Sequence, residues 1–101
     1  MPKEIILYNL APGVTHEEYA RYVKEKKGPF FEGLIGVKKF TLVRMVSSKT
    51  ETLPFQYVGI VELSNLEEWR RETASPAFAT FMKEWTGKVS DFYILSGEEV
   101  Y

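Results

Sequence analysis

The sequence contains no cysteine, and only one of its 101 residues is a histidine, His16. Without cysteine the chain cannot form disulfides, thiolate nucleophiles or zinc–cysteine sites. A single histidine among scattered carboxylates also lacks the ligand spacing of a metal site. His16 is predicted at the first position of a helix, where the dipole disfavours its charged form. It is therefore either an exposed surface side chain or a proton-transfer group.

The sequence also lacks a charge excess of either sign and long apolar runs. The formal net charge is −1, with basic and acidic residues interspersed, so no basic stripe is available for nucleic acid. No apolar run approaches the roughly 20 residues of a membrane helix. The start, Met-Pro-Lys-Glu, leads directly into an expected strand, without a signal peptide. We therefore expect a cytoplasmic protein with no nucleic-acid or membrane partner.

Aromatic side chains are abundant, at 15% of the residues, within an ordinary apolar share of 45%. The apolar pattern repeats one unit twice: a strand, an amphipathic helix and a second strand. Helices begin near His16 and Leu66, and the predicted strands are Ile5–Leu10, Phe40–Val46, Phe55–Leu63 and Val89–Ser96. This βαββαβ order predicts one α+β, ferredoxin-like domain over residues 1–101. Right-handed crossovers would place both helices on one face of a four-stranded antiparallel sheet.

Local signals place the ends of the predicted helices. Thr15 is a typical N-cap for the first helix, and Gly28-Pro29 is expected to stop or kink it. Ser64 and Asn65 are equally good caps for the second helix, since each has a glutamate three residues later. Ser75-Pro76 predicts a break in that helix, because serine caps well and proline suits the first helical position.

The third predicted strand is largely apolar on both of its faces. One face holds Phe55, Tyr57, Gly59, Val61 and Leu63, and the other holds Gln56, Val58, Ile60 and Glu62. Both faces must therefore be covered, and the two helices can cover only one. A second copy of the chain is the simplest cover for the other face, which predicts a homodimer.

Several segments resemble the REDY-like proteins of the dimeric α+β barrel superfamily, and together they cover nearly the whole chain. They are the strand-to-helix junction 10–19, the link formed by Pro29, Leu34, Gly36-Val37 and Phe40, the third strand 57–63, Leu66–Trp69, and the helix break 74–78. The resemblance implies a homodimer whose two sheets close into a barrel. Relatives include small cofactor-free oxygenases, isomerases and cyclases, as well as haem enzymes.

The chain departs from several of these relatives at their motifs. Polyketide cyclases of the superfamily carry His-Pro-x-His at the helix break, where this sequence reads Ser75-Pro76-Ala77-Phe78. Haem-degrading relatives use an asparagine, a tryptophan and a histidine. Asn9 and Trp69 could match the first two, but the second helix has no histidine. We therefore expect neither a haem nor a metal cofactor.

Polar and aromatic groups on the predicted strands and helices are candidates for a ligand pocket between sheet and helices. Arg44 is either a structural charge, paired with Glu62 on the neighbouring strand or lying at a strand edge, or a group inside the barrel that orients an anionic ligand. The tyrosines and tryptophans are alternatively core or dimer-interface residues. The candidate pocket residues are Tyr8, Asn9, Tyr22, Arg44, Tyr57, Trp69, Phe78 and Tyr93.

These candidates favour a small-molecule-binding protein or a cofactor-free enzyme of oxygenase, isomerase or cyclase type. Its ligand would be an apolar or aromatic metabolite, and hydroxyl or guanidinium groups would supply hydrogen bonds or proton transfer. The alternative is a non-catalytic dimeric protein that binds a metabolite or serves a structural role. A pocket between sheet and helices separates the two, because an interior filled by side chains would leave no room for a substrate.

Overall fold

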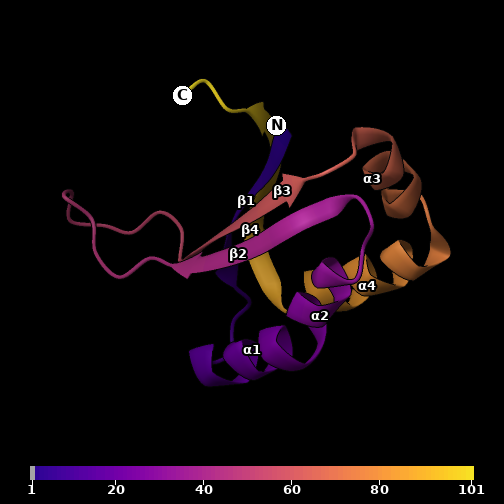
Figure 1. The fold of residues 1–101 in the computed structure, drawn as a ribbon. Coiled ribbons are helices and arrows are strands. Elements are labelled where there is room, and N and C mark those ends of the chain that lie inside the picture. Colours follow the sequence, from indigo (N-terminus) through magenta and orange to yellow (C-terminus); the bar gives the residue numbers. More distant parts are fainter. Residues whose placement is uncertain (1) are drawn as a thin grey trace.

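The computed structural model describes residues 2–101; Met1, part of the predicted domain 1–101, lies outside the described residues. The elements follow the predicted βαββαβ order, with the first helical segment divided into three parts and the second into two (Figure 1). Their bounds are β1 Pro2–Leu10, α1 His16–Tyr22, the π-helical turn η1 Val23–Lys27, α2 Gly28–Glu32, β2 Val37–Arg44, β3 Tyr57–Leu63, α3 Leu66–Thr73, α4 Pro76–Thr86 and β4 Val89–Glu98.

The four strands form one sheet in the order β2-β3-β1-β4, with every neighbouring pair antiparallel. The helices gather on one side of this sheet (Figure 1). The ferredoxin-like fold class is therefore confirmed. Strand ends differ from the prediction by a few residues. Pairing of Val37 with Leu63 and of Pro2 with Glu98 extends β2, β1 and β4, whereas β2 ends at Arg44 instead of Val46 and β3 begins at Tyr57 instead of Phe55.

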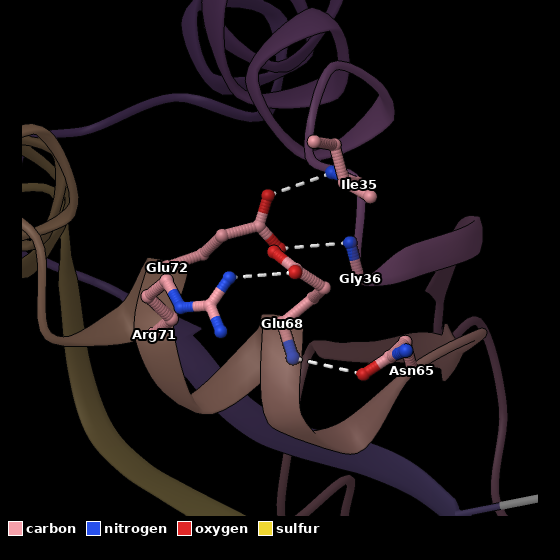
Figure 2. Close-up of polar contacts among 6 residues, drawn as sticks. All are labelled: Ile35, Gly36, Asn65, Glu68, Arg71 and Glu72. Carbon is pink, nitrogen blue, oxygen red and sulfur yellow. Dashed lines mark hydrogen bonds and ion pairs between the residues drawn. The ribbon is translucent and has the colours of Figure 1, made fainter.

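Side-chain caps fix the helix starts. The Thr15 hydroxyl accepts a hydrogen bond from the Glu18 N–H at 3.1 Å. Asn65, rather than Ser64, caps α3, since its side-chain oxygen accepts from the Glu68 N–H at 2.9 Å (Figure 2). The predicted break is confirmed at Ser75, whose hydroxyl accepts from the N–H of Phe78 at the start of α4.

The first helical segment does not stop at Gly28-Pro29 but passes through the π-helical turn η1 into α2. The Gly28 N–H bonds to the Val23 carbonyl five residues back. A Cβ on Gly28 would lie 2.9 Å from that same oxygen, so the widened turn requires glycine here. Such π-turns occur often at functional sites. This one ends on Lys27, which points into the protein.

The core consists of two aromatic-rich clusters between the sheet and the helices. The first is built around Tyr8, Tyr19, Tyr57 and Trp85, and the second around Phe31, Val61, Leu63 and Trp69. Trp69 and Trp85 are buried in these clusters, as their helical spacing predicted. Both tryptophans also face the pocket described below.

A carboxylate fastens α3 to the chain before β2. The two oxygens of Glu72 accept hydrogen bonds from the N–H groups of Ile35, at 2.7 Å, and Gly36, at 2.8 Å (Figure 2). Gly36 approaches α3 so closely that a Cβ added to it would lie 2.6 Å from the backbone nitrogen of Trp69. The nearby Arg71–Glu68 ion pair lies on the exposed surface and adds little. The fastening fixes the position of Trp69 over the sheet.

The two faces of β3 differ in burial as its sequence pattern predicts. Tyr57, Gly59, Val61 and Leu63 are buried under the helices, whereas the alternate residues Val58, Ile60 and Glu62 are half-exposed. Strand pairing extends this outer face with apolar neighbours. Its apolar residues are Ile5, Leu7, Val43, Val58, Ile60, Tyr93 and Leu95. In residues 2–101, no helix is both long and apolar enough to cross a membrane.

Candidate functional site

An apolar pocket of about 220 Å³ lies between the sheet and the helices α3 and α4. Its walls are almost wholly hydrophobic, and the charged residues that line it are Glu4 and Lys27. The other residues that line it are Ile6, Trp69, Thr73, Phe78, Phe81, Met82, Trp85 and Ile94. Two predicted pocket residues, Trp69 and Phe78, are therefore in its wall. The interior is not filled, so it leaves room for a small molecule.

The pocket adjoins a larger and more polar hollow of about 420 Å³ at the end of the sheet. The two share Glu4, Trp69 and Thr73, and the outer hollow adds Arg70 and Glu98. The two cavities therefore lie side by side, separated by these shared residues.

Lys27 is the chemically distinctive residue of the pocket. Only 3% of it is exposed, and its amine hydrogen-bonds to the hydroxyls of Tyr8, at 3.2 Å, and Tyr19, at 3.1 Å. The nitrogen also lies 4.8 Å from the ring centres of Tyr8 and Trp85. Among residues 2–101, no carboxylate forms an ion pair with it. A buried lysine is usually paired, so this arrangement calls for a function.

Burial controls the protonation of this amine. Removal from water disfavours the charged form, and no nearby carboxylate compensates, so the pKa of Lys27 falls from 10.5 to about 7. The aromatic rings around the nitrogen favour the ammonium form to some degree, but desolvation prevails. A large fraction of the amines is consequently neutral, with a free electron pair, at neutral pH.

The hydroxyls around Lys27 form a short hydrogen-bonded chain. The oxygens of Tyr8 and Tyr19 are 2.6 Å apart, and the Trp85 indole N–H donates to Tyr19 at 3.0 Å. Burial raises the pKa of Tyr19 to about 12, and raises that of Tyr8 well above its usual value. Both hydroxyls therefore stay protonated at neutral pH. Neither tyrosine lines the apolar pocket, but both hydroxyls can pass a proton to and from the amine.

Arg44 and Tyr57 lie together in a separate hollow of about 330 Å³ beside α1. The Tyr57 hydroxyl is 2.9 Å from Nδ1 of His16, which is half-buried rather than an exposed surface histidine. Strand register places Arg44 opposite Tyr57, and Glu62 opposite Lys39. The expected ion pair between Arg44 and Glu62 is therefore wrong, because the two side chains lie at opposite ends of the β2–β3 pairing.

The remaining predicted residues lie away from the apolar pocket. The Asn9 side chain bonds to the backbone of Pro54 and Gln56, fastening the β2–β3 loop. Tyr93 lies on the outer sheet face, where its ring packs edge-on against Phe55. The Tyr22 hydroxyl is buried with no hydrogen-bond partner among the described residues, and burial raises its pKa. It faces a third hollow between α1 and α4.

Sequence reasoning missed Lys27 and Tyr19 as candidate site residues. Lys27 stands in the run Lys24–Lys27, which is typical of a solvated helix face. A signal was nevertheless present: Lys27 follows Tyr19 by eight residues and Val23 by four. At that spacing Lys27 lies on the same side of the helix as Tyr19 and Val23, which pack in the core. A lysine at such a position is a candidate for a buried amine.

Comparison with known proteins gives the family. The family described as REDY-like protein HapK matches residues 2–100. The chain belongs to this family. The resemblance inferred from the sequence is thus confirmed over nearly its whole length. A search of curated proteins found no match.

Solved structures share the REDY-like fold at low sequence identity. At3g17210 from Arabidopsis thaliana is 16% identical with a TM-score of 0.86, covering 100% of this chain and 97% of that one. HapK from Hahella chejuensis is 17% identical with a TM-score of 0.78, and the match covers 99% of this chain and 93% of HapK. A mutant of SnoaB, a cofactor-independent oxygenase from Streptomyces nogalater, is 15% identical with a TM-score of 0.77. The match covers 99% of this chain and 93% of SnoaB. At these identities the likeness supports the fold alone.

Proposed function

We propose that this REDY-like protein binds a small apolar or aromatic compound between sheet and helices and transfers protons there without a cofactor. The Lys27 amine serves as the acid–base group. The observation that carries the proposal is that Lys27, almost fully buried and without a carboxylate partner in residues 2–101, is one of the residues that line an apolar pocket. Purely structural lysines gain little from such a place, because burial of the ammonium form is costly.

The size and walls of the pocket define the ligand. Its volume of about 220 Å³ is below the roughly 300–1,000 Å³ of sites for drug-sized molecules, so a compound of one or two rings fits. Trp69, Phe78 and Trp85 offer aromatic surface on several sides. Aromatic side chains pack well against aromatic ligands. The cofactor-independent chemistry for which SnoaB is described is compatible with a fold of this kind.

Proton transfer follows from the groups around the amine. A neutral Lys27 can accept a proton from a bound carbon acid, and the ammonium ion so formed can return it to another atom. The tyrosine hydroxyls 3.1–3.2 Å from the amine, still protonated, can relay a proton to and from it. These steps need neither a metal nor an oxidant.

Nitrobenzisoxazole is a suitable probe, since a base that removes its ring C–H proton breaks the N–O bond and releases a coloured cyanophenolate. The wild-type protein should catalyse this elimination, with a rate that rises with pH through about 7 as Lys27 loses its proton. Lys27→Met should lower the rate about 100-fold or more, because a positioned base contributes roughly that much.

Lys26→Met is the matched control, since Lys26 is an exposed neighbour paired with Glu84, and its rate should equal that of the wild type. Equal rates for the wild type and Lys27→Met would contradict the assignment of the base.

We further propose that two chains associate through the outer face of the sheet. The face carries seven apolar side chains, among them Tyr93, 56% exposed, and Leu95, 49% exposed, in a single chain. Burying it in a two-fold dimer would cover an area comparable to the roughly 800 Å² per partner of a stable interface. A contiguous apolar patch of this kind marks an association surface.

Sedimentation at micromolar concentration should give twice the 11.7 kDa of one chain. Ile60→Glu places a charge at the centre of the outer face and should yield monomers. Ile35→Glu, at an exposed apolar position outside the sheet, should leave the dimer intact. A wild-type protein that sediments as a monomer would exclude the dimer.

A further inference from the structure

We propose that Lys27 forms a covalent imine with the carbonyl group of an aromatic aldehyde or ketone bound in the apolar pocket. The inference rests on the proposed function and names the class of substrate. It starts from geometry: Lys27 is one of the residues that line the pocket, two hydroxyls lie within 3.2 Å of its amine, and no carboxylate is paired with it in residues 2–101.

Imine-forming lysines need an amine that is both unprotonated and shielded from water. Desolvation in a hydrophobic pocket is a general way to activate a lysine as a nucleophile. Lys27 meets this condition, because only 3% of its surface is exposed and the other walls of the pocket are mainly aromatic and aliphatic. A carboxylate beside the nitrogen would hold it in the ammonium form and prevent attack.

The reaction balances with the groups present. The electron pair of the Lys27 nitrogen attacks the carbonyl carbon, forming a C–N bond, while the π electrons of the carbonyl move to oxygen. A proton moves from nitrogen to that oxygen through the Tyr8 and Tyr19 hydroxyls, giving a carbinolamine. The nitrogen then gives its remaining proton to the hydroxyl group, the C–O bond breaks, the oxygen leaves as water, and a neutral C=N bond remains. No oxidant or reductant is needed.

The lining restricts which carbonyl compounds enter. Among the residues that line the pocket, Lys27 is the only cation, and Glu4 disfavours anions. A neutral one- or two-ring carbonyl compound is favoured over a carboxylate-bearing keto acid, whose desolvated charge would be unpaired. In a ketone with a C–H bond next to the carbonyl carbon, protonation of the imine nitrogen would acidify that C–H bond, which extends the proton transfer proposed above.

Trapping by reduction tests the inference. The full-length protein is incubated with naphthaldehyde and sodium cyanoborohydride near pH 7, and the modified lysine is identified by peptide mass spectrometry. We expect one naphthylmethyl group per chain, at Lys27, formed at least tenfold faster than at the exposed Lys26. Lys27→Met should lose this fast reaction, whereas Lys26→Met should retain it.

Modification spread evenly over exposed lysines, at a rate unchanged in Lys27→Met, would overturn the inference. The nitrobenzisoxazole probe has no carbonyl group and cannot form an imine. If its elimination depends on Lys27 but trapping does not occur, only the imine is wrong. If neither occurs, the proposed function fails as well.

Discussion

Lys27→Met is expected to stabilise the protein by about 3 kcal/mol near pH 6, although it removes two hydrogen bonds. The shift of the Lys27 pKa from 10.5 to about 7 corresponds to roughly 5 kcal/mol, at about 1.4 kcal/mol per unit. Loss of the hydrogen bonds to Tyr8 and Tyr19 reduces this gain in stability by about 1 kcal/mol for each bond. Methionine has a similar length and fills the same space without a charge to desolvate.

The pH dependence of this effect has a defined sign. Between about pH 7 and 10.5 the unfolded chain binds a proton at Lys27 that the folded chain does not bind. The wild-type protein therefore gains stability as pH rises through this window, and the full cost of burial is present below about pH 7. Lys27→Met has no such group, so its advantage should vanish near pH 10.

Urea unfolding near pH 6 and pH 10 measures the effect, with Lys26→Met as the control for loss of a surface lysine. The control should differ little from the wild type at either pH, since its ion pair with Glu84 is exposed. A variant Lys27→Met that is less stable than the wild type by the same amount at both pH values would show that the amine is charged and structurally paired.

Trp85→Ala is expected to lower the free energy of unfolding by about 3–5 kcal/mol. Trp85 is 2% exposed and packs edge-on against Tyr8, with ring centres 5.2 Å apart. Its indole N–H also holds Tyr19 in place. Removing it leaves a large cavity beside Lys27, and many domains have only 5–15 kcal/mol in total. The variant should unfold at a markedly lower urea concentration.

Two further variants separate the contributions of Trp85. Trp85→Phe keeps most of the packing and loses only the indole donor, so a smaller loss of about 1–2 kcal/mol is expected, because Tyr19 keeps its other partners. Ile35→Ala, at a position 74% exposed, should change stability by less than about 0.5 kcal/mol. A loss below about 1 kcal/mol for Trp85→Ala would contradict the assignment of this residue to the core.

The parts of the fold that depend on local pattern could be predicted from the sequence. The two apolar faces of Tyr57–Leu63 indicated that the helices cover only one of them, and Ser75-Pro76 predicted the helix break, because neighbouring residues determine both. The register of β2 against β3 was not predicted, because the long polar loop between them does not define it as a short hairpin turn would. That is why Arg44 was assigned a partner that lies too far along the strand.

The candidate site was predictable only in its apolar walls. Trp69 and Phe78 follow helical periodicity, so their inward placement is a local property. The burial of Lys27 depends on the π-turn that Gly28 permits and on tyrosines from both β1 and α1. Its altered pKa arises from the folded surroundings as a whole, which no short sequence pattern encodes.

The central claim is that Lys27 is a buried amine that is substantially neutral at neutral pH. Nuclear magnetic resonance of the protein with isotope-labelled lysine follows each side-chain amine as pH changes, and the Lys27 signal is the one missing from Lys27→Met. A midpoint near 7 for this signal is the predicted result. A midpoint near 10.5, as for the exposed lysines, would contradict the claim and remove the chemical basis of the proposed function.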